Sequence, residues 1–151
     1  MEIRLTTQES EKIFHHALCN EGGAFRGADC EITWSNTNYK KAKSKIQKLV
    51  DKGEIPHFVY WASYDKKEGK KPTVCFEDVI MQMLLDGGSL KLIDHNGGDY
   101  NRTITIKEIH ERVQKSPVNC IMSLNEGGDG GDMWTAFSVL QTVFFEEEIF
   151  G

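Results

Sequence analysis

The segment 76–113 constrains the fold more than any other part of this chain. Apolar residues recur at helical spacing from 76 to 86, and two glycines then stop the pattern. The next stretch, 89–104, is rich in strand-forming residues and turns at Asn96-Gly97, a dipeptide typical of hairpins. Thr105 and Glu108 then have the spacing of a capping box that opens a helix. This order predicts helix, hairpin and helix in succession.

Further elements are expected where the same signals recur. They are a strand at 2–5, a helix at 7–19 capped by Thr6 and Glu9, a strand at 30–34, a helix at about 39–50, a strand at 57–64, a helix opened by Ser116-Pro117, and a helix from Asp132 to about 143. Strands joined by both hairpins and helices, without a regular strand–helix–strand repeat, indicate the α+β class. We therefore expect one compact α+β domain over residues 1–151, with a small, mostly antiparallel sheet that contains a hairpin and packs with four to six helices.

The composition is that of a soluble globular domain. With 151 residues, of which 39% are hydrophobic and 27% charged, the chain is long enough to bury a core. No stretch approaches the ~20 apolar residues of a membrane span, and the first residues lack the layout of a signal peptide. We therefore expect a cytoplasmic protein that makes no membrane contact.

The sequence contains no known catalytic or metal-binding motif. The cysteines are far apart, so we interpret all four as isolated buried thiols rather than as a zinc site or a disulfide framework: Cys19, Cys30, Cys75 and Cys120. His15 and His16 are neighbours on a helix and point about 100° apart, so they do not chelate one ion together. We therefore expect no cofactor and no enzymatic activity.

Positive charge is concentrated in one segment. Residues 36–72 contain ten lysines and four acidic residues, a net charge of +6, while the rest of the chain carries eight basic and nineteen acidic residues, a net charge of −11. We interpret 36–72 as a lysine-rich helix–strand insertion in the domain. Its lysines and aromatic residues fit an interaction site, for which the candidates are Lys40, Lys41, Lys45, Lys48, Tyr60 and Trp61. An ordinary solvated lysine face is the alternative, and the segment has no arginine for bidentate phosphate contacts.

Two loops combine glycine with acidic residues and provide a metal-binding alternative. Glu126, Asp129 and Asp132 are interspersed with glycines and could wrap a hard cation, although their spacing is not that of an EF-hand. Asp94, His95 and Asp99 flank the hairpin turn in a similar way. The other interpretation is that these residues form turns and cap helices.

Three stretches resemble a group of short uncharacterised bacterial proteins that are often encoded in phage or other mobile-element neighbourhoods. They are FEDVIMQMLLDGGSLKLID, ITIKEIHERV and the closing LQTVFFEEEIFG. The resemblance covers residues 5–19 and 76–151, and the lysine-rich stretch 47–71 is longer than expected for the group. The resemblance implies a mobile-element origin and carries no catalytic motif.

These observations favour a protein that binds another macromolecule. The first hypothesis is a regulatory protein with a protein partner, such as a phage-encoded inhibitor of a host process. The second is a single-stranded nucleic-acid-binding module that uses the lysine and aromatic residues of 36–72. The third is a metal-dependent hydrolase built on the acidic loops. The apolar and acidic tail 144–150 either forms a homo-oligomer contact or packs under the protein's own sheet.

Overall fold

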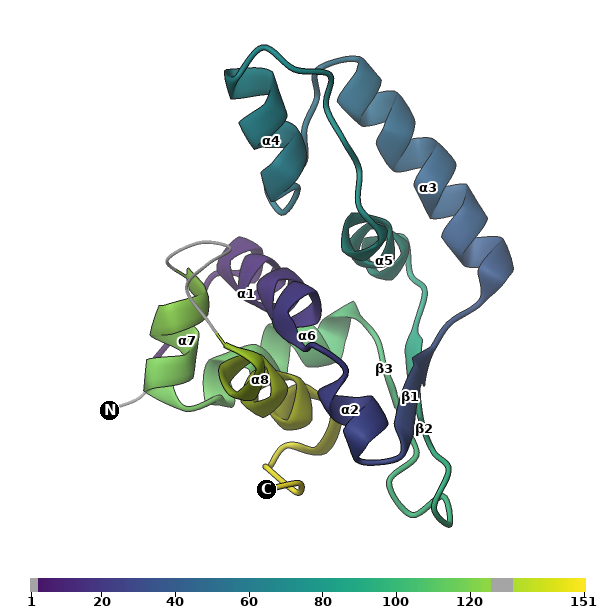
Figure 1. The fold of residues 1–151 in the computed structure, drawn as a ribbon, viewed down its shortest axis with the longest axis vertical. Coiled ribbons are helices and arrows are strands. Elements are labelled where there is room, and N and C mark those ends of the chain that lie inside the picture. The colour runs from purple at the N-terminus through teal and green to yellow at the C-terminus, as the bar shows by residue number, and fades with distance from the viewer. Residues whose placement is uncertain (1–2, 126–131) are drawn as a thin grey trace.

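A computed structural model describes residues 3–125 and 132–151, apart from the side chains of residues 60–63. Within these residues the chain forms eight α-helices, one 3₁₀ turn and three strands (Figure 1). In chain order they are α1 (Thr7–Asn20), α2 (Ala24–Gly27), β1 (Cys30–Thr33), α3 (Asn36–Asp51), α4 (Tyr60–Lys67), α5 (Phe76–Leu85), β2 (Leu90–Asp94), β3 (Arg102–Ile104), α6 (Ile106–Arg112), η1 (Val113–Lys115), α7 (Val118–Asn125) and α8 (Met133–Phe145). The α+β class is confirmed, and the short helices α2 and α4 account for the helices beyond the expected four to six.

The three strands form one antiparallel sheet in the order β1-β2-β3. Leu92 of β2 lies opposite Ile32 of β1 and Arg102 of β3. Leu90, Leu92 and Ile104 are buried, while the intervening Lys91 and Thr103 are exposed, as expected for a sheet with one solvated face. The predicted hairpin between β2 and β3 is therefore confirmed.

The predicted strand at 2–5 is not present in residues 3–5, and its first residue lies outside the described range. The backbone N–H of Leu5 donates to the side-chain oxygen of Gln114 at 3.1 Å instead of to a neighbouring strand. This side-chain contact, which joins residues 109 positions apart, is invisible to a local pattern.

Helix α8 is the centre of the core. It contacts α1, α2, α6, α7 and β3, and its residues from Ala136 to Phe144 are all buried. The tail that follows folds back on this helix, because Gln141 accepts hydrogen bonds from the backbone N–H groups of Ile149 and Phe150 at 2.7 Å. The ring of Phe150 also lies 5.4 Å from that of Tyr100 in the hairpin loop. The apolar tail therefore packs within its own chain.

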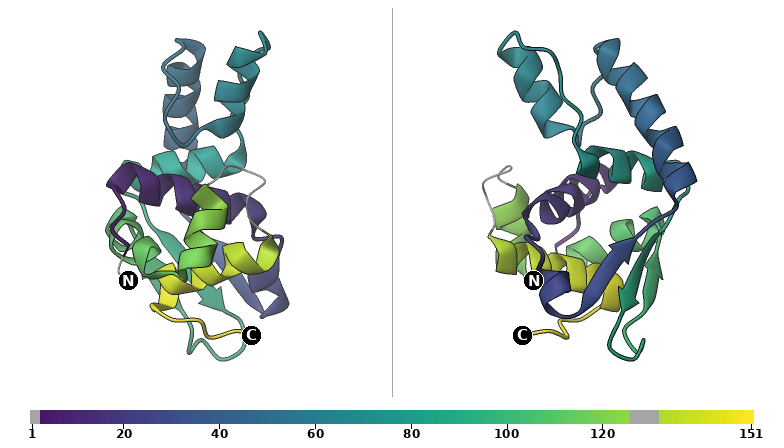
Figure 2. Two further views of the ribbon diagram at one scale, coloured as in Figure 1. Left: turned by 90° about the vertical axis from the view of Figure 1, so that its left-hand side faces the viewer. Right: turned by 45° about the vertical axis from the view of Figure 1, so that its right-hand side comes forward.

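Helices α3 and α4 form an arm that projects from the rest of the molecule, hereafter the body (Figures 1 and 2). The arm comprises residues 36–74, and α5 lies beneath it. Both views in Figure 2 show the arm extending away from the two chain termini. The lysine-rich segment predicted as an insertion is thus the most prominent feature of the molecular shape.

The strand predicted at 57–64 is wrong, because residues 60–67 form helix α4. Phe58 and Val59, which precede the helix, are both buried, at 1% and 0% exposure. A half-buried strand would bury only every second residue. The aromatic and β-branched run therefore anchors a loop in the core, and the chain turns into a helix directly after it.

Local signals at the ends of helices are otherwise confirmed. The capping boxes of Thr6 with Glu9 and of Thr105 with Glu108 both form. Gly53, at φ +80°, provides the left-handed residue that ends α3. None of the helices in the described ranges combines the length and apolarity needed to cross a membrane.

Candidate functional site

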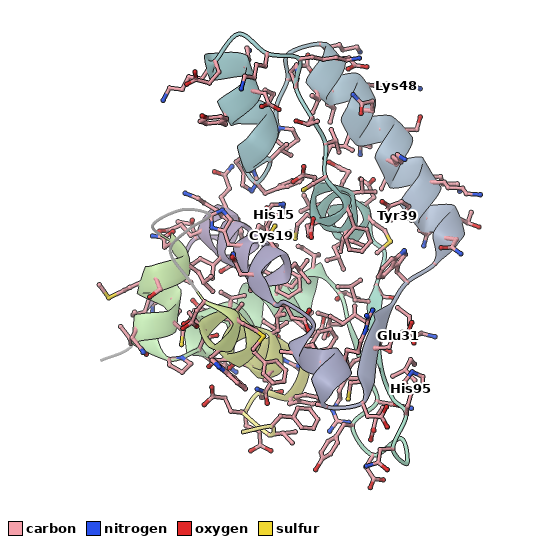
Figure 3. The ribbon with its side chains drawn as sticks, in the orientation of Figure 1. His15, Cys19, Glu31, Tyr39, Lys48 and His95 are labelled. Carbon is pink, nitrogen blue, oxygen red and sulfur yellow. The ribbon has the colours of Figure 1, made fainter. Side chains whose placement is uncertain are left out.

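Helix α3 has one buried face and one lysine face. Ala42, Ile46 and Val50 are buried, and the helix packs on α5. The opposite side carries exposed lysines. Four of them are spaced four, three and four residues apart, so they follow one side of the helix and form a stripe: Lys41, Lys45, Lys48 and Lys52. At 1.5 Å of rise per residue this lysine stripe extends over about 16 Å. Figure 3 shows Lys48 on the side of α3 that faces away from α4.

Three of the four lysines of the stripe have no acidic partner among the described residues. Lys45 Nζ lies 2.6 Å from Asp86 Oδ1 at the end of α5, and no ion pair within residues 3–125 and 132–151 engages Lys41, Lys48 or Lys52. Lys40, the remaining lysine candidate, is exposed but lies about 100° around the helix from Lys41, outside the stripe. Of the lysines predicted from the sequence, Lys41, Lys45 and Lys48 therefore share one side of α3. The prediction did not include Lys52, which lies one residue beyond the helix.

The aromatic candidates are less well defined. Tyr60 and Trp61 belong to the first turn of α4, and their side chains lie outside what the structure describes. Tyr64, on the same helix, is 43% exposed. The expectation that Tyr60 and Trp61 form part of the interaction site therefore stays a prediction.

The arm is attached to the body on both sides. Beneath α3, the ring of Phe76 lies 4.9 Å from that of Trp34 and 5.9 Å from that of Tyr39. On the α4 side, the buried carboxylate of Glu11 on α1 forms hydrogen bonds with His57 Nε2 at 2.9 Å and with His110 Nε2 at 2.6 Å. Since His57 precedes α4 and His110 lies on α6, one carboxylate connects the arm to two helices of the body.

A second group of polar side chains lies between α1 and α5, with its histidine and aspartate buried. His15 Nε2 lies 2.6 Å from Asp78 Oδ1, and Asp78 Oδ2 accepts the backbone N–H of Cys75 at 2.9 Å. Cys19 Sγ lies 3.9 Å from His15 Nδ1. Figure 3 shows His15 and Cys19 on the side of α1 that faces α5. Cys19, Cys75, His15 and Asp78 are hereafter called the thiol cluster.

Burial and hydrogen bonding shift the pKa values in the thiol cluster. Burial lowers the pKa of His15, but the hydrogen bonds with Asp78 and Cys75 and the negative charge of Asp78 outweigh it and raise that pKa to about 9. The hydrogen bond with Cys19 and burial raise the pKa of the Cys75 thiol. At neutral pH these shifts favour an imidazolium at His15, paired with the Asp78 carboxylate, and a thiol rather than a nucleophilic thiolate at Cys75.

The interpretation of the cysteines as isolated buried thiols holds only in part. Cys30 and Cys120 are buried, while Cys19 is exposed and Cys75 is half-buried beside it. The separation of 56 positions between Cys19 and Cys75 concealed their contact, which depends on how α1 packs against α5. A usable signal was present in the shorter spacings, since His15 and Cys19 are four apart on one helix and Cys75 and Asp78 are three apart at the start of another.

A hollow of about 450 Å³ lies between the end of α1, α2, β1 and α5. Apolar side chains such as Phe25 and Phe76 line it together with one guanidinium, that of Arg26, and with four carboxylates, those of Glu21, Asp29, Glu31 and Glu77. Glu31 is paired with His95 at 3.1 Å, and Figure 3 shows both on the outer side of the sheet. This concentration of negative charge makes the hollow unsuitable for a polyanion.

The acidic loops serve structural roles where they are described. Asp132 accepts the backbone N–H of Thr135 at 2.8 Å and caps α8, whereas Glu126 and Asp129 lie outside the described residues. In the hairpin loop, the carboxylate of Asp94 accepts the backbone N–H groups of Asn96 and Tyr100 at 2.8 and 3.2 Å. Cap and turn formation therefore accounts for Asp94 and Asp132 without a cation.

Comparison with known protein families, with curated protein sequences and with solved structures finds no match to this chain. The resemblance to phage and mobile-element proteins therefore stays an expectation from the sequence. The geometry of the arm and of the thiol cluster is the basis for the proposals that follow.

Proposed function

We propose that this protein is a non-enzymatic binding protein that holds single-stranded nucleic acid on the lysine stripe of its arm. The observation that carries the proposal is the placement of Lys41, Lys48 and Lys52 along one exposed side of a projecting helix, without acidic partners in the described part of the chain. Ammonium groups arranged in a row can neutralise successive phosphates and release their counterions.

The choice of single strands follows from the rest of the segment. A single strand is flexible enough to pass from the lysine stripe around the arm to α4, which carries the partly exposed ring of Tyr64, and base stacking on such a ring tolerates any base. The segment 36–72 contains lysines but no arginine, the residue best suited to bidentate contacts with guanine edges. We therefore expect binding that depends on the backbone charge of the nucleic acid and little on its base sequence.

The negative charge of the rest of the chain limits the interface to the arm. Residues outside 36–72 carry a net charge of −11, and the acidic hollow lies below the arm between α1, α2, β1 and α5. At physiological salt, charges interact over only about 8 Å, so the lysine stripe can attract a phosphate chain locally. A path of nucleic acid over the body would meet repulsion.

The proposal is tested by the salt dependence of binding to fluorescently labelled oligonucleotides, measured by anisotropy. Neutralisation of three phosphates by Lys41, Lys48 and Lys52 predicts a slope of log K against log salt of about −2 for single strands, equivalent to a loss of about 20-fold between 50 and 200 mM salt. Undetectable binding to single and double strands at 20 to 50 mM salt, or binding with no salt dependence, would overturn the proposal. In that case a protein partner, as in the phage-inhibitor hypothesis, becomes the leading explanation for the arm.

A further inference from the structure

The thiol cluster brings together donor atoms from two helices that are remote in sequence. His15 and Cys19 lie one turn apart on α1, while Cys75 and Asp78 lie at the start of α5. Among the described residues, His15, Cys75 and Asp78 form a group of metal-ligating side chains whose ligand atoms all lie within 4.8 Å of one another. Cys19 adds a second sulfur next to His15 and Cys75.

The orientation of the His15 ring decides which atoms are ligands. Nε2 is held by Asp78 at 2.6 Å, which leaves Nδ1 facing the sulfur of Cys19 at 3.9 Å. In a tetrahedral zinc site, bonds of ~2.3 Å to sulfur and ~2.0 Å to nitrogen place these two atoms about 3.5 Å apart. A displacement of a few tenths of an ångström would therefore allow both atoms to bind one ion.

Asp78 occupies the position of a supporting carboxylate. One of its oxygens binds Nε2 of His15, the ring nitrogen opposite to the one that faces Cys19, and the other accepts the Cys75 N–H. Histidines that bind zinc commonly donate their second ring N–H to a carboxylate, which fixes the ring and strengthens it as a ligand. The side chain is 1% exposed, so its orientation is fixed by the surrounding core.

We propose that Cys19, Cys75 and His15 Nδ1, supported by Asp78, bind a thiophilic divalent cation, Zn²⁺ in particular. Two sulfurs and an imidazole favour zinc over Ca²⁺ or Mg²⁺, which prefer oxygen ligands. Three protein ligands leave a fourth position for water. Because Cys75 directly follows the arm in the chain, the ion would link the end of the arm to helix α1 through His15 and Cys19. The inference is independent of the proposed nucleic-acid binding, and it differs from the absence of a cofactor expected from the sequence.

The test uses the full chain, treated with a chelator and then kept in a phosphine reductant so that Cys19 and Cys75 remain thiols. Titration with Co²⁺ is followed by the thiolate-to-cobalt charge-transfer absorption, and Zn²⁺ is then added as a competitor. We expect one Co²⁺ per chain, displaced completely by one Zn²⁺, and a higher melting temperature with Zn²⁺. Absence of the charge-transfer band, or an unchanged melting temperature with Zn²⁺, would overturn the proposal.

Single substitutions locate the ion. Cys19→Ser changes an exposed residue and should fold normally. It should lose the charge-transfer intensity of one sulfur and bind the ion at least tenfold more weakly. Cys75→Ser should show the same two losses. Asp78→Asn should retain the band and bind 10- to 100-fold more weakly, as expected for a supporting group. Cys120→Ser, which removes a buried thiol on α7, is the matched control and should bind like the wild type. Wild-type binding by Cys19→Ser would contradict the assignment even if Cys75→Ser failed to fold.

Discussion

Glu11 is the residue that links the arm to helices α1 and α6 of the body through two hydrogen bonds. Its side chain is 5% exposed, and each of its oxygens meets the Nε2 of a different histidine, His57 or His110. A carboxylate has acceptor capacity on both oxygens, whereas an amide has one acceptor oxygen and one donor group. The site is therefore matched to Glu and mismatched to Gln, although the two side chains have nearly the same size.

Substitution of Glu11→Gln should lower the free energy of unfolding by about 1–3 kcal/mol, because one imidazole N–H would then face the amide NH₂. Urea denaturation measures the change. Glu111→Gln, an exposed position on α6, is the control and should stay within about 0.5 kcal/mol of the wild type. Equal stability of the two variants would show that the two contacts of Glu11 contribute little.

His15 makes stability depend on pH in the metal-free protein. Its pKa of about 9 in the folded state lies above the ordinary value of 6.5, so folding favours its protonated form. The resulting stabilisation is complete below pH 6.5 and is lost as the pH rises through about 9. The loss is at most about 3 kcal/mol by linkage.

The comparison with Asp78→Asn isolates this contribution, because an amide oxygen can still accept the Cys75 N–H but no longer pairs with an imidazolium. The difference in unfolding free energy between wild type and variant should be largest near pH 6 and decrease by pH 10. Chemical denaturation at both pH values, in the presence of a chelator, measures it. A difference that grows with pH would have the wrong sign for an imidazolium–carboxylate pair.

At the scale of secondary-structure elements, α3 combines two roles on opposite faces. Ile46 is fully buried against the body, while the lysine stripe is exposed. Ile46→Ala should cost about 2–5 kcal/mol, since it removes buried methyl groups and leaves a cavity. Ser44→Ala, on the exposed face, should be nearly neutral. Thermal or urea unfolding of both variants tests this division, and a neutral Ile46→Ala would mean that α3 does not pack on α5 as described.

Elements with matching local signals at both ends were predictable from the sequence. Helix α5 and the hairpin follow from the apolar period and the paired glycines. Asn96-Gly97 correctly marks the position of the reversal, but the connection is a longer loop over residues 95–101, in which Gly97 and Gly98 have positive φ, rather than a two-residue turn. Helix α4 was not predictable in this way. The run before α4 is β-branched and aromatic, which favours a strand, and no side chain caps the helix at Val59. The structure of this run depends instead on the burial of Phe58 in the core, which is a tertiary contact.

The two candidate sites also differ in whether a local sequence pattern can reveal them. The lysine stripe lies on one helix, so helical spacing alone brings Lys41, Lys45 and Lys48 to one side. The thiol cluster requires α1 and α5 to meet, which no local pattern specifies. Its two halves are visible in the sequence as the pairs His15 with Cys19 and Cys75 with Asp78, but only the packing of the two helices shows that they belong together.

At the scale of the whole molecule, charge and shape coincide. The net positive segment is the projecting arm, and the net negative remainder is the body with its acidic hollow. Exposed lysines also occur on the body, among them Lys91, Lys107 and Lys115. The central claim is therefore about position as well as charge, and the two sets of three lysines allow position to be tested at constant net charge.

The most direct test compares the triple variant Lys41→Ala, Lys48→Ala and Lys52→Ala with the triple variant Lys91→Ala, Lys107→Ala and Lys115→Ala. Anisotropy titrations with a labelled single-stranded oligonucleotide should give the arm variant a salt slope smaller by about 2 and an affinity at least tenfold lower at 50 mM salt. The body variant should keep the wild-type slope. Equal losses in the two variants, or a loss confined to the body variant, would contradict the assignment of the binding surface to the arm.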